Sequence, residues 1–386
     1  MWFKISSEFD SRFPRHYQFG NSRLINTDEG WSTVDTANAN MLFKGYCHEH
    51  RDLYTLALEL GRDPTPRYTG NFVAIITYPD GRVAITSDTT RPCPIWYNDA
   101  GEVGNIGLEG KNIWSDAWIE LDKDLKQHFW PAVPGAAAGR TLEHTVDNID
   151  RLLTEKFLSL RLRERIKVFY SAGIDTLTCI AYLRALKIPH ELVTAEHYDY
   201  DQFTLEFDNE LRSHWGYTQI HHWRERAMLV TGGCGDEYFM RGPATANMML
   251  MHLGLQMQDV LQPHHYHYKY FQGIEKSAIY QRQLTDPEIQ ASIKTRSGVT
   301  DHIMRMCIND HQHWHLGNTL TFTPFKDMRI LQMVLSTNDT DLVEAMMDAT
   351  IQKQLIARHF PELINYLATH KNQDRTGIYR LANDLY

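Results

Sequence analysis

The sequence has few cysteines, and they are poorly placed for pairing or for binding a metal. Their number is odd, they are widely spaced, and none forms a C-x-x-C pair: Cys47, Cys93, Cys179, Cys234 and Cys307. This usage argues against a disulfide framework, a zinc knuckle and an iron–sulfur cluster. It is typical of a protein in a reducing compartment, so we expect a cytoplasmic location.

Long apolar runs and excess positive charge are also missing. The most apolar run, Met248 to Leu255, is interrupted by His252 and is much shorter than a membrane span. The first ten residues carry charges where a signal peptide needs an apolar stretch. The net charge of −9 offers no overall basic field for a phosphate backbone. We therefore expect neither a membrane nor a nucleic acid as partner.

Two common nucleotide-binding motifs are absent. No G-x-x-x-x-G-K-[ST] occurs, and no G-x-G-x-x-G follows a predicted strand. Their absence argues against γ-phosphate transfer by a Walker loop and against simple dinucleotide binding. What is present is a chain of 386 residues with 42% hydrophobic and 23% charged residues, which is long enough for two domains with their own cores.

A segment rich in proline and glycine divides the chain. Phe129 to Arg140 contains two prolines and two glycines without helical or strand periodicity, so we predict domains of residues 1–135 and 136–386. In the first domain, two β-rich runs, Gly70 to Thr77 and Arg82 to Thr86, flank the turn sequence Pro79-Asp80-Gly81. This pattern predicts a hairpin and a smaller, β-rich α+β domain.

The second domain alternates helical and strand patterns. Apolar residues at helical spacing from Leu142 to Leu160 precede a short apolar run, a glycine turn and a second helical stretch. Three such apolar runs predict strands: Ile166 to Tyr170, Leu192 to Ala195 and Ala227 to Val230. The pattern predicts an α/β fold with a parallel sheet covered by helices. Farther on, Asp341 to His359 reads as one amphipathic helix.

Two glycine-rich turns follow predicted strands and carry the chemistry. The first, Ser171 to Thr176, combines a hydroxyl, a glycine and a helix N-terminus, which together can hold a diphosphate. The second, Thr231 to Glu237, repeats the arrangement. Asp175 and Asp236 would suit such a site if Mg²⁺ joined them to phosphate oxygens. Either turn alone is also typical of a helix cap, but two in one domain favour a phosphate site.

These turns resemble those of a known family. Val168 to Thr176, V-F-Y-S-A-G-I-D-T, resembles the pyrophosphate loop S-G-G-x-D-S of asparagine synthetases and β-lactam synthetases, and T-G-G-C-G-D-E resembles their S-G-E-G-S-D-E. Weaker matches extend over nearly the whole chain: Pro324 to Asp327, Lys371 to Gln373, Gly70 to Ala74, and Ser87-Asp88 through Pro94 to Tyr97.

The resemblance implies an adenine nucleotide alpha hydrolase-like domain behind an Ntn-type, class II amidotransferase-like domain. It also implies an ATP- and Mg²⁺-dependent ligase that adenylates a small-molecule carboxylate, releases pyrophosphate and joins the acyl group to an amine or ammonia as an amide or lactam. A homodimer is compatible with it. By this resemblance Asp175 and Asp236 bind the metal, and the ATP-binding residues are Tyr170, Ser171, Ala172, Gly173, Asp175, Thr176, Val193, Thr231, Gly232 and Gly235.

The sequence departs from the family at functional positions. Residue 2 is Trp2 where glutaminase chemistry needs an N-terminal cysteine, so we expect no glutamine hydrolysis. Gly233 stands where asparagine synthetases carry a glutamate. Glu237 is the nearest remaining carboxylate and the candidate catalytic acid or base, or else a structural partner of a helix end or of Arg241. Lys371 is the candidate for neutralising developing charge, or else a surface lysine.

Two other functions stay open. Gly233 and Ala172 also fit a catalytically silent nucleotide-binding or interaction module. A nucleic-acid-modifying enzyme of the wider pyrophosphate-loop group would use the same adenylation, although the acidic charge argues against it. The methionines of one stretch fit either core packing or the wall of an apolar pocket: Met248, Met249, Met251 and Met257.

Overall fold

The structure is a computed structural model, and it describes most of the chain. The described residues are 3–19, 23–47, 49–50, 52–68, 70–88, 95–105, 111–112, 117–122, 127–131, 139–162, 165–169, 173–193, 228–300, 302–303 and 320–367. The chain divides into two compact units. The described residues up to 131 belong to the first unit, and those of 139–193, 228–303 and 323–367 to the second.

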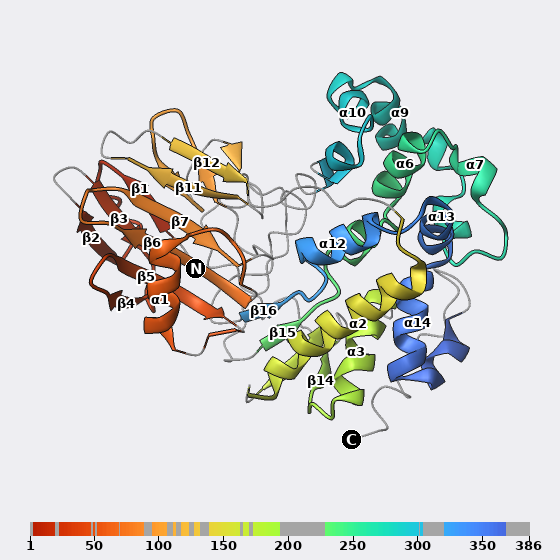
Figure 1. The fold of residues 1–386 in the computed structure, drawn as a ribbon, viewed down its shortest axis with the longest axis horizontal. Coiled ribbons are helices and arrows are strands. Elements are labelled where there is room, and N and C mark those ends of the chain that lie inside the picture. Colours follow the sequence, from red (N-terminus) through yellow and green to blue (C-terminus); the bar gives the residue numbers. More distant parts are fainter. Residues whose placement is uncertain are drawn as a thin grey trace. The chain divides into compact units, whose positions relative to one another are not determined.

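The first unit contains two six-stranded antiparallel sheets. One has the order β10-β8-β9-β1-β3-β2 and the other the order β12-β11-β7-β6-β5-β4 (Figure 1). The strands of the first sheet are β1 (Phe3–Ser6), β2 (Arg15–Phe19), β3 (Arg23–Thr27), β8 (Trp96–Tyr97), β9 (Val103–Gly104) and β10 (Lys111–Asn112). Those of the second are β4 (Ser32–Asp35), β5 (Asn40–Cys47), β6 (Gly70–Thr77), β7 (Val83–Ser87), β11 (Ala117–Leu121) and β12 (Gln127–Pro131).

Strand β6 is buried on both of its faces. Val73 and Ile75 join one apolar core with residues of both sheets, such as Ile5. Phe72 and Ala74, which point the other way, join a second core with Leu56 and other residues of helix α1 (Leu53–Arg62). Successive side chains of a strand point to opposite faces, so a sheet covered on both sides needs a continuous apolar strand. The predicted hairpin is confirmed, because β6 pairs with β7 in antiparallel register.

The predicted start of the linker is wrong by three residues. Phe129 to Pro131 belong to β12, which pairs with β11 and places Trp130 opposite Trp118. β12 is the last strand of its sheet, and Pro131 is its last residue. Proline is tolerated at such an edge because no further strand needs its missing N–H.

The second unit contains the predicted parallel sheet. β13 (Ile166–Phe169) pairs in parallel with β14 (Glu191–Val193) and with β15 (Met228–Val230). Within this unit the strand order is β14-β13-β15. A further strand, β16 (Leu320–Phe322), belongs to the first unit. The predicted helices are confirmed as α2 (Leu142–Leu158) and α3 (Ile174–Ala185). α2, α3 and α14 (Thr350–His359) lie side by side (Figure 1).

Shorter helices make up most of the remainder of this unit. They are α5 (Gly235–Tyr238), α6 (Pro243–His252), α7 (Met257–Val260), α8 (Tyr268–Phe271), α9 (Ala278–Thr285), α10 (Pro287–Ser292), α12 (Met328–Leu335) and α13 (Asp339–Asp348), with 3-10 turns η1 (Ser159–Leu162), η4 (Ile274–Lys276) and η5 (Pro361–Tyr366). None of the helices described combines the length and the apolar character that crossing a bilayer requires.

The single helix predicted for Asp341 to His359 is wrong. The segment forms α13 and α14, which are separated at Ala349, where φ is +55°. The end of α13 accepts hydrogen bonds from another segment: His267 N donates to the carbonyl of Met347, and Tyr266 N donates to the side chain of Asp348. These long-range contacts end α13, and the local amphipathic pattern contains no sign of them.

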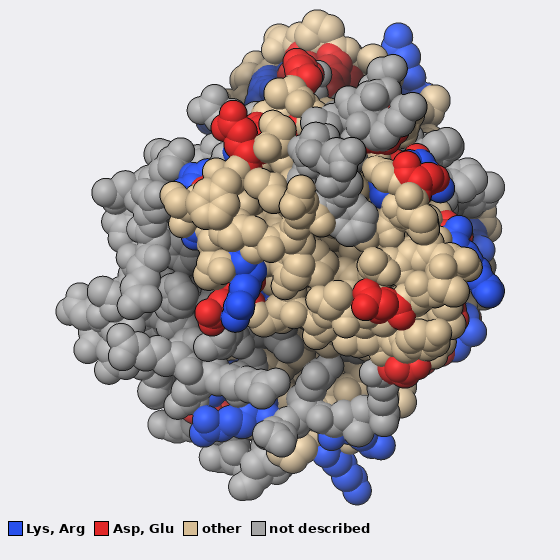
Figure 2. Space-filling model, turned by 90° about the vertical axis from the view of Figure 1, so that its left-hand side faces the viewer, with Lys and Arg blue, Asp and Glu red and all other residues tan. Residues whose placement is uncertain are grey.

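Charged side chains are interspersed on the face seen in Figure 2. Lysine and arginine alternate there with acidic and uncharged residues, without forming one continuous basic area among the described residues. A nucleic acid backbone is bound by clustered positive charge, and the described residues of this face form no such cluster.

Candidate functional site

The two glycine-rich turns begin at neighbouring strand ends. β13 and β15 are adjacent and parallel, with Val168 opposite Val230. The carboxyl ends of the two strands therefore lie at the same edge of the sheet, which is where α/β proteins bind ligands. Thr231 follows β15 directly, and Gly173 is the N-cap of α3.

Two glycines of the second turn lie directly against the start of α3. A Cβ atom added to Gly232 would lie 2.8 Å from Cβ of Asp175 and 2.9 Å from the backbone N of Thr176. One added to Gly235 would lie 2.2 Å from Cγ of Asp175. Side chains at these positions would force the turns apart, so glycine is needed here because of the close approach.

Arg241 joins the two predicted metal-binding carboxylates. Its Nη2 contacts Oδ1 of Asp175, and its Nη1 lies 3.2 Å from Oδ1 of Asp236. Gln352 donates from Nε2 to the same Oδ1 of Asp175 at 3.2 Å, and Nε2 of His267 lies 3.1 Å from Nη1 of Arg241. The guanidinium side chain is only 1% exposed. Asp175 and Asp236, which are far apart in the sequence, thus both contact the buried guanidinium group of Arg241.

Burial and charge act together on this cluster. Burial raises the pKa of Asp175 to about 6, against the effect of Arg241, and the neighbouring charge of Asp236 acts in the same direction as burial. Burial alone would lower the pKa of Arg241, but the two carboxylates hold it above its usual value. One guanidinium faces two carboxylates, so the cluster keeps an excess of negative charge when both are ionised.

The two carboxylates supply the kind of oxygen that a hard cation binds. Arg241 makes its shortest contact with Oδ1 of each residue, and among the described residues neither Oδ2 of Asp175 nor Oδ2 of Asp236 accepts a hydrogen bond. Mg²⁺ is commonly held by one or two carboxylates together with substrate phosphates. The described part of the chain contains no group of three or more His, Cys, Asp or Glu residues placed to hold a metal. A cation at these oxygens would therefore need further ligands from a bound phosphate.

The other predicted binding residues that the structure describes lie in the two turns and at the end of β14. Thr176 is buried in the first turn of α3, and Val193 is the last residue of β14, paired with Phe169. The Thr231 hydroxyl accepts a hydrogen bond of 2.9 Å from Gly233 N and so shapes the second turn from within. Four predicted residues lie outside the described part of the chain: Tyr170, Ser171, Ala172 and Lys371.

Glu237, the predicted acid or base, lies in α5 next to Asp236. Among the described residues the ion-pair partners of Arg241 are Asp175 and Asp236, and the role of Glu237 stays a prediction. The charges of Asp236 and Glu237 act on Tyr270. Burial raises the pKa of Tyr270 to about 12, and these two charges act in the same direction.

Sequence reasoning missed three residues of the cluster. It did not connect Arg241 to the aspartates, and it did not place His267 or Gln352 at the site. Arg241 follows Asp236 closely enough for a turn to bring them together, which is a weak signal. Gln352 lies on α14, 177 positions after Asp175, and nothing local marks it.

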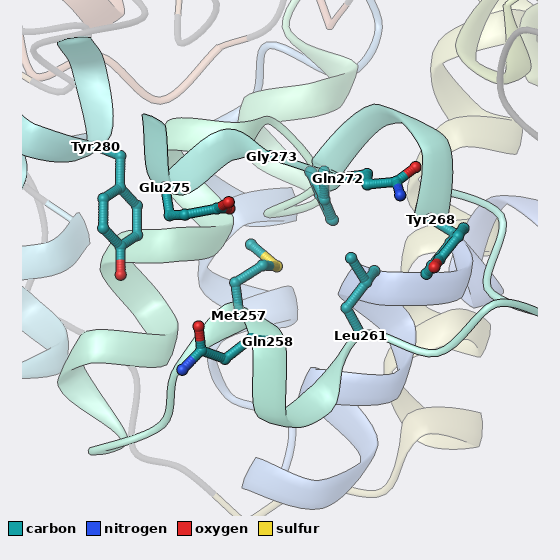
Figure 3. A pocket seen from close by; sticks show the side chains of 9 residues that line it. Met257, Gln258, Leu261, Tyr268, Gln272, Gly273, Glu275 and Tyr280 are labelled. Atoms are coloured by element: carbon teal, nitrogen blue, oxygen red, sulfur yellow. The ribbon is translucent and has the colours of Figure 1, made fainter. Parts of the chain in front are cut away.

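A separate pocket lies among the short helices of the second unit. Its volume is about 230 Å³, and its lining includes apolar residues of α7 and α8 and the polar residues Glu275 and Tyr280. In Figure 3 the side chains of Met257 and Glu275 point toward the same space. Met257 thus lines a pocket, whereas Met248 and Met249 are fully buried core residues. Phe271, also in the lining, has its ring centroid 5.3 Å from that of His267, the partner of Arg241.

The chain matches no model of a protein family and no curated protein.

Proposed function

We propose that the protein is an ATP-dependent carbon–nitrogen ligase that adenylates a small-molecule carboxylate and passes the acyl group to an amine or ammonia. The observation that carries this proposal is the meeting of Asp175 and Asp236 at neighbouring ends of a parallel sheet, beside glycines that leave no room for side chains. The resemblance of both turns to those of asparagine and β-lactam synthetases adds the reaction type. It also suggests an adenine nucleotide alpha hydrolase-like second domain and an amidotransferase-like first domain.

In this proposal each part of the site has one task. The backbone N–H groups at the start of α3 and in the second turn bind the β and γ phosphates, since a helix N-terminus and a glycine turn favour anions. Mg²⁺, held by the two aspartates, would neutralise charge on the phosphates. The substrate carboxylate attacks the α phosphate, pyrophosphate leaves, and the amine then displaces AMP from the acyl-adenylate. Glu237 would take the proton of the amine, and Lys371 would stabilise the departing charge.

The first domain would have no glutaminase activity. In this proposal the nitrogen comes from free ammonia or from an amine. We further propose a cytoplasmic location and small molecules, rather than nucleic acid, as partners.

The test is to incubate the protein with MgATP, candidate carboxylates and amines, and to measure AMP and pyrophosphate. AMP release that depends on the carboxylate and is lost in Asp175→Asn would support the ligase. Asp259→Asn, an exposed acidic residue of α7, is the matched control and should behave as wild type. Failure of the wild-type protein to bind ATP at all would overturn the proposal.

A silent nucleotide-binding module is the second candidate, because the aspartates are already paired with an arginine and Gly233 replaces the family glutamate. ATP binding without AMP release, across a broad set of carboxylates and amines, would favour it. AMP release that required tRNA or DNA would instead indicate a nucleic-acid-modifying enzyme.

A further inference from the structure

The backbone around Arg241 is folded back on itself so that this side chain reaches the two aspartates. Met240, the residue before it, has φ of +59°, which is a strained value for a residue with a long side chain. The backbone N atoms of Arg241 and Gly242 then both donate to the carbonyl of Asp236, at 2.6 and 2.7 Å. Strain of this kind persists only where the surroundings favour it, and it is concentrated at functional sites.

Arg241 makes its shortest contacts with one oxygen of each carboxylate. These are Oδ1 of Asp175 and Oδ1 of Asp236, and neither Oδ2 accepts a hydrogen bond from a described residue. Gln352 supports the same orientation, since it also donates to Oδ1 of Asp175. The arrangement holds two like charges close together on one guanidinium group.

A fixed positive charge beside these oxygens also affects which cations can bind. A divalent cation at the Oδ2 atoms would be attracted by two carboxylates and repelled by a buried guanidinium a few ångströms away. In a poorly solvated site such repulsion is only weakly screened. Bound phosphates would restore the attraction, because they bring further negative charge and further oxygen ligands.

We propose that Arg241 is the resident cation of the Asp175–Asp236 pair: it holds both carboxylates in place in the nucleotide-free protein and prevents a divalent cation from binding to them alone. The cation then enters only together with phosphate oxygens; this last step rests on the proposed function, whereas the role of Arg241 in the free protein does not.

The experiment measures binding of Mn²⁺, used without nucleotide, to the full-length protein by electron paramagnetic resonance. We expect no saturable binding to the wild type at submillimolar Mn²⁺, and one bound Mn²⁺ in Arg241→Gln with an affinity raised roughly tenfold or more. The double variant Arg241→Gln/Asp236→Asn should lose the added site. Arg241→Lys retains the charge and should remain without bound Mn²⁺.

Two results would overturn the proposal. One is a Mn²⁺ ion bound to the wild type and lost in Asp236→Asn, which would show that the arginine does not exclude the cation. The other is a folded Arg241→Gln protein without added Mn²⁺ binding. If Arg241→Gln is unfolded without metal, recovery of its circular dichroism in Mn²⁺ supports the proposal, and no recovery contradicts it. Since ATP is absent throughout, failure of the ligase assay leaves this result unaffected.

Discussion

Replacing Gly235 by alanine is the sharpest test of how the two glycine turns fit together. The added Cβ would lie 2.2 Å from Cγ of Asp175 and 2.3 and 2.6 Å from its two carboxylate oxygens. The carboxylate would have to move by about 1.2 Å to reach ordinary contact at 3.4 Å. Such a movement pulls Asp175 away from Arg241.

The expected cost follows from three contributions. Overpacking of a tight interior costs about 1–3 kcal/mol. Separating a buried carboxylate from its arginine costs up to about 3–5 kcal/mol when one partner is left uncompensated. Gly235 begins α5 and does not have positive φ, so alanine recovers about 0.5–1 kcal/mol of helix propensity. We therefore expect Gly235→Ala to lower the free energy of unfolding by at least about 3 kcal/mol.

The assay is urea denaturation of single and double variants. Gly233→Ala, in the same turn, is the matched control, because its added Cβ would meet only side-chain atoms of Thr231 and Thr323 at 3.1 and 3.3 Å. It should cost less than about 1 kcal/mol. Asp175→Ala removes the three atoms that the Gly235→Ala methyl group would strike, so the cost of Gly235→Ala should fall by at least about 1 kcal/mol in that background. Equal costs for the two glycine variants, or an unchanged cost in the Asp175→Ala background, would refute the reasoning.

Three further predictions concern the scaffold. Lys156 is 4% exposed, and its Nζ lies 2.7 Å from Oδ2 of Asp327. Lys156→Met should therefore lower the free energy of unfolding, measured in urea, by about 3 kcal/mol, and a change below about 1 kcal/mol would contradict this. Burial opposes ionisation of Asp150, but hydrogen bonding to His359 and other partners lowers its pKa from 3.8 to about 2. Its stabilising effect should therefore be complete above pH 3.8 and disappear as the pH falls through about 2, so stability curves of wild type and Asp150→Asn should converge in acid. A Cβ atom added at Gly61 in α1 would meet only Cβ of Ala39, at 3.4 Å. Gly61→Ala should therefore stabilise the protein by about 0.5–1 kcal/mol, and a lower melting temperature of the variant would contradict this.

Local patterns were sufficient for the strands and helices next to the site. The apolar run at Ile166 forms β13, and the helical stretch from Ile174 forms α3. Both patterns lie within a few adjacent residues, so they can be recognised in the sequence without knowledge of distant contacts. The β6–β7 hairpin followed from turn residues between two β-rich runs for the same reason.

The same local reasoning failed where a distant segment changed the outcome. The break at Ala349 depends on hydrogen bonds from residues 266 and 267, and the strand at Phe129 depends on pairing with β11. Residues 266 and 267 are far from Ala349 in the sequence, and β11 is a separate strand that pairs Ile119 with Phe129. The periodicity of a segment gives no information about its partners in other elements. The proposed reaction, its substrates and the roles of Glu237 and Lys371 stay predictions.

The sequence by itself determined that two glycine turns follow buried strands and that each contains an aspartate, because turn chemistry is a property of adjacent residues. Only the tertiary structure decided that Arg241 joins the two aspartates and that Gln352 supports one of them. The physical reason is that ion pairing depends on distance in space. The two turns after parallel strands already predicted that Asp175 and Asp236 meet, whereas Gln352 lies 177 positions after Asp175 and no local pattern marks it.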